Sequence, residues 1–122
     1  MYIEDDLRVM LAEAMDVDVY SRMFPVTLPE SVMVQAVGGH SSTASIRRTY
    51  HTVSVMACSD DRETAGILMR QARDILTTGL PARIRGTFYY TAVPLADGSM
   101  FRKTEAGPKY IEFVDMEVAC SI

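Results

Sequence analysis

The stretch Tyr50–Leu80, YHTVSVMACSDDRETAGILMRQARDILTTGL, is the clearest fold signal in the sequence. Its first part, Thr52–Cys58, mixes β-branched and small apolar residues with Thr and Ser at alternate positions, which is typical of a strand with one packed face. Asp60 and Glu63 follow, three residues apart as in a capping box, and predict the start of a helix. The stretch therefore predicts a strand that runs through a helix cap into a helix.

The predicted helix covers residues 60–78 and has one apolar face. Its apolar residues recur at helical spacing, and most of its charged residues fall on the other face. The apolar face consists of Ala65, Leu68, Met69, Ala72, Ile75 and Leu76. Gly79 suits the position after the helix, and Pro81 prevents the helix from continuing. We expect this strand and helix to form the rigid scaffold, and the loops that they hold to carry the function.

Length and composition favour one globular domain over residues 1–122. The chain is 48% hydrophobic and 23% charged, and it is long enough to enclose a single core. Its net charge of −4 gives the chain as a whole no attraction to nucleic acid or to an anionic membrane. No apolar run approaches the length of a membrane span, and the acidic start MYIEDDLRVM lacks the basic region of a secretion signal. We therefore expect an intracellular protein.

The remaining segments complete an α+β pattern. Residues 2–15 carry an amphipathic stripe and predict a short helix, whose acids Glu4–Asp6 complement the helix dipole. Three more strands are predicted at Ser31–Val37, Arg83–Pro94 and Lys109–Ser121. This order of elements predicts an antiparallel or mixed four-stranded sheet with the two helices packed mainly on one face.

The sequence also predicts where one strand ends, which residues share a face of another, and a bulge in the last. Gly38-Gly39 is expected to end the first strand. Alternation in residues 83–94 places Phe88 and Tyr90 on one face and Tyr89 on the other. In the last strand the apolar parity changes, which predicts a β-bulge near Val114-Asp115.

A separate loop, Asp16–Glu30, contains Tyr20, Met23 and Phe24 together with two prolines. We expect it to wrap a sheet edge or to pack onto a neighbour.

Two segments are candidates for contact with other proteins. Residues 40–46, HSSTASI, predict a polar surface loop that two arginines close. Leu95–Pro108 contains the turn signals Asp97-Gly98 and Gly107-Pro108 and predicts a projecting hairpin or loop arm. An exposed apolar pair on such an arm indicates a protein contact, with packing onto its own domain as the alternative. The candidate subunit-interface residues are Arg47, Arg48, Met100, Phe101, Arg102 and Lys103.

The sequence contains no recognisable catalytic or metal-binding constellation. His40 and His51 have no Cys or acid at ligand spacing, so a zinc site is not predicted. A G-x-S-x-G nucleophile elbow is absent, and the sequence GGHSS lacks the spacing of a phosphate loop. We therefore assign no catalytic residue, no metal ligand and no cofactor.

Two cysteines and one aromatic pair are further candidates for chemistry. Cys58 and Cys120 lie in strand-like segments, and reduced core thiols are favoured over a disulfide. Tyr89-Tyr90 with Arg83 and Arg85 leaves stacking on single-stranded nucleic acid as a minor alternative.

The order of features supports one resemblance that covers almost the whole chain. An opening amphipathic helix ends in MDVDVY and is followed by a proline-bearing loop, FPVTLPE, and the strand VMVQAVGG. A polar loop then leads to HTVSVMACSDDRETAGILMRQARDIL and to two long strands that a turn-rich insertion separates. This layout resembles the tail terminator (tail completion) proteins of long-tailed bacteriophages, a group that overlaps the phage minor capsid families. The proline-bearing loop and the insertion have lengths of their own here.

The resemblance implies a structural virion protein rather than an enzyme. Tail terminators of this type form a ring, typically a hexamer, on the completed tail tube, stop polymerisation of the tube and present a surface that joins the head. The implied partners are other copies of the chain, the tail tube protein and the head–tail connector (stopper) protein, with no membrane. DNA would pass through the channel without specific binding.

The implied location is the tail or neck of the virion, after assembly in the host cytoplasm. Two alternatives stay open. One is a head-completion (stopper) or other neck connector protein, and the other, from a different class, is a small ferredoxin-like ligand-binding domain or enzyme.

Overall fold

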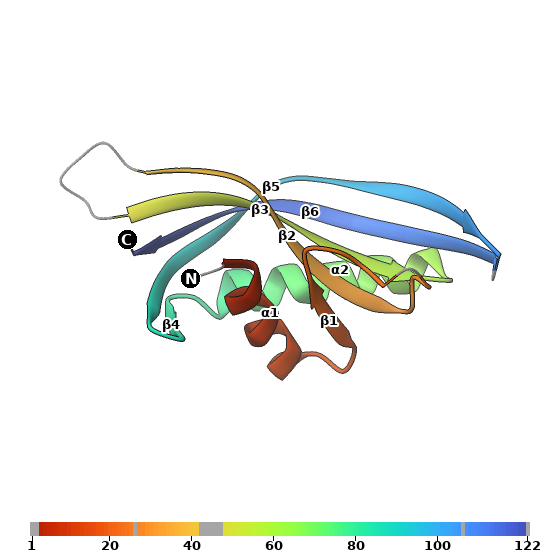
Figure 1. Cartoon of the computed structure of the whole chain (residues 1–122), viewed down its shortest axis with the longest axis horizontal. Helices are drawn as coiled ribbons and strands as arrows, with labels where there is room; N and C mark the ends of the chain where they lie inside the picture. Colours follow the sequence, from red (N-terminus) through yellow and green to blue (C-terminus); the bar gives the residue numbers. More distant parts are fainter. Residues whose placement is uncertain (1–2, 26, 42–47, 106, 122) are drawn as a thin grey trace.

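The computed structural model describes residues 3–25, 27–41, 48–105 and 107–121. Along the chain the elements are α1 (Ile3–Ala14), β1 (Asp18–Ser21), β2 (Ser31–Ser41), β3 (Arg48–Ser59), α2 (Arg62–Thr78), β4 (Ala82–Ile84), β5 (Thr87–Thr104) and β6 (Gly107–Ser121). The strands form one six-stranded sheet in the order β1-β2-β3-β6-β5-β4, and Figure 1 shows both helices on the same face of it.

The predicted α+β class and the two helices are confirmed, but the predicted number of four strands is wrong. The sheet is mixed, because β1 runs parallel to β2 while the other neighbours are antiparallel. The two additional strands are β1, with four residues, and β4, with three. Strands this short at the sheet edges are too brief to show a period-2 pattern, so the sequence placed β1 inside a loop and joined β4 to β5.

The core lies between the helices and one face of β2, β3 and β6. Val34, Val55 and Val114 are paired across these three strands and are almost fully buried. Leu7 of α1 and Leu76 of α2 cover them with no exposed surface. Each such side chain contributes about 1.5–3 kcal/mol of burial free energy, so this layer sets the position of both helices.

The cap of α2 differs by one residue from the prediction. Asp61, not Asp60, is the N-cap, and its Oδ2 accepts a hydrogen bond of 3.2 Å from the backbone N of Thr64. Hydrogen bonds from the Thr64 hydroxyl and backbone lower the pKa of Asp61. Asp60 instead pairs with Lys109 of β6, and this contact moves its carboxylate away from the helix end.

The second strand is longer than predicted. β2 continues through Gly38 and Gly39 to Ser41, with a shift in its pairing to β3 between Ala36 and Gly38. The glycines therefore mark a bulge inside the strand rather than its end. The predicted loop begins later than residue 40, and its remainder, including Arg47, lies outside the described residues.

The segment predicted as one strand over residues 83–94 is a short hairpin of β4 and the start of β5. Arg85 and Gly86 form its turn with positive φ values of 47° and 89°. Tyr89 is fully buried on the helix side, as alternation against Phe88 predicts. A pairing shift after Tyr89 then brings Ala92 to the same side as Tyr89, although strict alternation along the strand would place it with Phe88.

The second face of the sheet carries no helix but is partly covered. Residues 22–25 and 27–30 cross it, and their cover buries Met33 and Ile111 to 4% and 3% exposure. Of the two alternatives for the segment Asp16–Glu30, wrapping a sheet edge or packing onto a neighbour, the structure shows the first, with the difference that its Asp18–Ser21 part is itself the edge strand β1. The predicted β-bulge in β6 is wrong, because both faces of β6 are packed and its apolar residues of either parity are buried; the pairing shifts lie in β5.

β5 and β6 extend together as an antiparallel hairpin, which Figure 1 shows projecting beyond the end of α2. We call residues Ala96–Asp115 of this hairpin the arm. The predicted arm is thus a regular ladder down to the Thr104–Gly107 pair. Asp97-Gly98 is not its turn but lies inside β5, because Phe113 of β6 packs over Gly98: a Cβ there would lie 2.7 Å from Phe113 Cζ.

Candidate functional site

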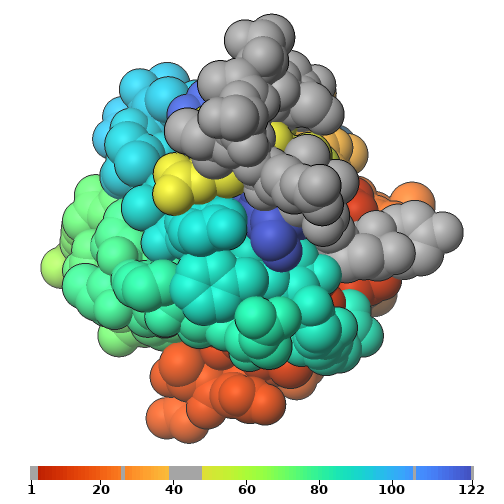
Figure 2. Space-filling model, turned by 90° about the vertical axis from the view of Figure 1, so that its left-hand side faces the viewer, coloured from red at the N-terminus to blue at the C-terminus, as the bar shows by residue number. Residues whose placement is uncertain are grey.

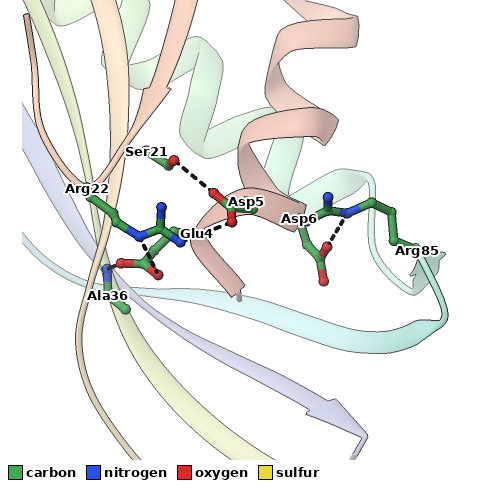
Figure 3. Close-up of polar contacts among 7 residues, drawn as sticks. All are labelled: Glu4, Asp5, Asp6, Ser21, Arg22, Ala36 and Arg85. Carbon is green, nitrogen blue, oxygen red and sulfur yellow. Dashed lines mark hydrogen bonds and ion pairs between the residues drawn. The ribbon is translucent and has the colours of Figure 1, made fainter. Parts of the chain in front are cut away.

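The three acids at the start of α1 hold the helix to the sheet, and Figure 3 shows their contacts. Glu4 Oε2 accepts a hydrogen bond of 3.3 Å from the backbone N of Ala36 at the edge of β2. Asp5 accepts from Ser21 Oγ at 2.9 Å and from Arg22 Nη2 at 3.0 Å. The Ser21 hydroxyl, followed by the Arg22 charge, lowers the pKa of Asp5. These contacts exceed the helix-dipole role that the sequence predicted.

Asp6 is the most buried of the three acids, with 1% of its surface exposed. Its Oδ1 accepts from Arg85 Nε at 2.7 Å, and its Oδ2 accepts a short hydrogen bond from the Tyr89 hydroxyl. Burial, and then the bond to Asp6, raise the pKa of the Tyr89 phenol above its usual value. The three groups connect α1 to the β4–β5 hairpin, so the role of this cluster is to hold these elements together.

The sequence contained a signal for the Asp6 cluster. Asp6 lies three residues after Ile3 and four before Met10, which places it on the apolar stripe of α1 rather than on the wet face. A carboxylate on a buried stripe requires partners. Nothing local in the sequence identifies Arg85 and Tyr89 as those partners, since they lie about 80 residues away.

The cluster also removes the nucleic-acid alternative in its predicted form. Tyr89 and Arg85 were two of its four residues, and both are engaged with Asp6. Arg83 lies over the ring of Phe88 at 5.7 Å, and Phe88 meets Tyr90 edge to face at 4.9 Å.

Arg48, one of the candidate interface residues, continues the row of stacked side chains that Arg83, Phe88 and Tyr90 form. Arg48 lies over the Tyr90 ring, with its Cζ 4.1 Å from the centroid. Figure 2 shows this end of the molecule, opposite the arm, where the yellow start of β3 lies beside the cyan start of β5. The structure therefore places Arg48, which is half-buried, far from the candidates on the arm.

The arm carries the other four candidates and divides them between its two faces. Met100 and Arg102 lie on the face without helices, while Phe101 and Lys103 lie on the helix side, because side chains alternate along a strand. Phe101 is 59% exposed and Met100 38%. Phe101 meets Tyr110 of β6 edge to face, with ring centroids 5.4 Å apart.

Next to Met100, a groove of 380 Å³ opens on the helix-free face between the arm and the loop after β1. We call it the Met groove, because four methionines line it. The lining residues are Arg22, Met23, Phe24, Pro25, Leu28, Met33, Gln35, Met56, Met100, Arg102 and Ile111. The sequence did not predict this groove, since its walls come from five separate segments.

The described residues offer little for chemistry. Among them, no group of three or more His, Cys, Asp and Glu side chains is placed to hold a metal ion. Cys58 and Cys120 are both buried and free. Burial raises the pKa of the Cys58 thiol, which is opposite to the shift that activates a nucleophilic cysteine.

In the described part of the chain, neither helix combines the length and the apolar character that a membrane span requires.

Comparison with known proteins finds likeness in structure but not in sequence. No protein-family model matches the chain, and no curated protein matches it. Among solved structures, a chain from the virion of a native gene transfer agent (GTA) particle superposes with a TM-score of 0.58 and 18% identity. The match covers 98% of this chain and 95% of the other. The two chains therefore share a fold over nearly their whole lengths.

Proposed function

We propose that this chain is a structural subunit of a phage or phage-like virion, and that it is the tail terminator. In this role it would form a ring on the completed tail tube, stop the tube from growing and provide the surface that joins the head–tail connector. The fold shared with a chain of a gene transfer agent virion, end to end, is the observation that carries the proposal.

The distribution of functional groups supports a role in assembly rather than in catalysis. Glu4, Asp5 and Asp6 all bind groups of their own chain. The exposed apolar surface is concentrated on β5, where Val93, Leu95 and Phe101 are each more than half exposed. Large exposed apolar side chains that gather on one projecting element are typical of a protein contact.

A ring with a central channel also suits the charge of the chain. The net charge is −4, so a ring of several copies repels DNA phosphates as a whole, which permits passage without retention. The proposed partners are further copies of the chain, the tail tube protein and the connector protein. A hexamer is the proposed ring size.

Two measurements test the proposal. Native mass spectrometry or light scattering of the full chain, alone and with tail tubes, is expected to show a ring-sized oligomer; a strict monomer that never joins tubes contradicts it. In a particle-producing host, deletion of the gene is expected to give tails of uncontrolled length or tails that do not join heads. Tails of normal length with heads that lose DNA would identify a stopper protein instead.

A further inference from the structure

The Met groove is an apolar recess on the helix-free face of the sheet. Met33 and Ile111 form its buried floor, while Met23 at its rim is 72% exposed. A volume of 380 Å³ is at the small end of the range of about 300–1,000 Å³ for ligand pockets, so it suits one or two side chains. The groove therefore fits a small apolar anchor rather than a domain.

Methionine gives such a groove a chemical preference. The thioether is flexible and polarisable, so it adapts to a partner and makes favourable contacts with aromatic rings, about 0.3–1.5 kcal/mol each. Four methionine side chains line one recess, and Phe24 adds a ring to its wall. The preferred occupant is therefore an aromatic side chain.

Phe101 is an aromatic anchor of the right kind on the same chain. It is 59% exposed and contacts its own chain through the edge of Tyr110. It projects from the helix side of the arm, whereas the groove opens on the opposite side, so Phe101 cannot fill the groove of its own chain. Aromatic residues, Phe among them, are enriched at protein interfaces relative to the rest of the surface.

The opposite placement of anchor and groove determines the kind of contact they can make. If Phe101 of one copy enters the groove of the next, that copy still presents its own Phe101 to a third. Such a head-to-tail contact generates a ring when its rotation closes. Arg62 and Glu112 lie beside Phe101 and form an ion pair of 3.5 Å, so their charges cancel. The surface around Phe101 therefore adds no net positive charge next to Arg22 and Arg102, which line the groove.

We propose that Phe101 of one subunit docks in the Met groove of a neighbouring copy, and that this contact joins the subunits of the ring. The inference rests on the proposed ring and names the surfaces that form it. It commits to a second copy of this chain, because anchor and groove occur once each per copy, on opposite faces, with matching chemistry.

Disulfide cross-linking of the full-length chain tests the contact. Phe101→Cys subunits are mixed with Met23→Cys subunits and oxidised; the native cysteines are both buried. We expect a disulfide between the two variants and none in either variant alone. Ile67→Cys, at a 42% exposed position on α2, replaces Met23→Cys in the control and should give none. Cross-links of Phe101→Cys to itself, or of Met23→Cys only to tube protein, overturn the inference.

An assembly measurement separates this inference from the proposed function. Phe101→Asp is expected to stay folded by circular dichroism but to need about 30-fold more protein, or more, to assemble, which corresponds to loss of a hot-spot residue. Ile67→Asp is the matched control and should assemble as the wild type does. If the wild type forms rings and Phe101→Asp forms them equally well, the docking is wrong while the ring stands. If the wild type forms no ring, both fail.

Discussion

At the scale of single residues, the contact between Asp6 and Tyr89 is the most consequential polar feature. Both side chains are almost fully buried, and the phenol donates to a carboxylate that also accepts from Arg85. Removing one partner from a buried charged group costs about 1–3 kcal/mol. We expect Tyr89→Phe to lower the free energy of unfolding by that amount in urea titrations. Tyr90→Phe, which keeps the ring under Arg48, is the matched control and should change it little.

The same phenol predicts the behaviour of the protein in alkali. The pKa of Tyr89 is raised above its usual value of about 10, chiefly by burial and then by Asp6. The folded state therefore holds the proton more tightly than the unfolded state, and this contribution is complete below about pH 10 and is lost above it. The unfolding equilibrium constant should rise by up to about tenfold per pH unit from this residue.

Comparison with Tyr89→Phe isolates that contribution, because other titrating groups are common to both proteins. Urea titrations from pH 8 to 11 should give curves that converge as the wild type loses its advantage. Parallel curves would show that Tyr89 ionises as readily in the folded protein as in the unfolded chain.

Residue-scale roles were predicted from the sequence only where the signal was local. The burial of the two cysteines follows from such a signal, because both lie in strand-like segments. The partnership of Asp6 with Arg85 and Tyr89 depends on a long-range packing of α1 against the β4–β5 hairpin. No spacing in the sequence encodes that contact, so the acid was assigned to the helix dipole alone.

At the scale of elements, periodicity sufficed for α1, α2 and the interior of the long strands. It failed where a side chain from another strand contacts a local motif and makes the motif adopt a different structure. Asp97-Gly98 has the sequence of a turn, yet Gly98 lies in β5 because the Phe113 ring occupies the space above it. In the same way, Asp60 pairs with Lys109, and Asp61 becomes the cap.

The effect of Gly98→Ala on stability should have opposite signs in the wild type and in a Phe113→Ala background. In the wild type, Gly98→Ala places a Cβ 2.7 Å from Phe113 Cζ, so the ring must move, and we expect the overpacking to cost about 1 kcal/mol. In a Phe113→Ala background the space is open, and Ala should stabilise the strand by about 0.5–1 kcal/mol relative to Gly. Urea titrations of the four proteins measure this coupling; an equal effect of Gly98→Ala in both backgrounds would contradict it.

At the scale of the whole molecule, the sheet order and the two-faced arm could not be read from the sequence. Strand order depends on which long strands pair, and β6 pairs with both β3 and β5 although they lie on either side of α2 in the chain. The Met groove depends on that order, since it brings Met56 of β3 and Met100 of β5 to opposite flanks of Ile111 in β6.

The outer part of the arm projects beyond the end of α2 (Figure 1), so it should be dispensable for folding but not for assembly. Met100 and Ile111 face each other across the arm, and an Asn-Gly turn can join them in place of residues 101–110. This shortening keeps the buried Ile111 and removes Phe101, Arg102 and Lys103. It also removes the Lys109–Asp60 ion pair, in which the Lys109 side chain is 9% exposed and the Asp60 side chain 78%.

We expect the shortened chain to lose about 1 kcal/mol of stability, because the buried Lys109 leaves together with its segment and Asp60, its former partner, stays in solvent. Circular dichroism and urea titration should show a folded protein, while light scattering should show a monomer, alone and with tail tubes. A ring from the shortened chain would place the subunit contact elsewhere, and Arg48 at the opposite end would become the first candidate. Unfolding of the shortened chain would instead mean that residues 101–110 are required for the core to form.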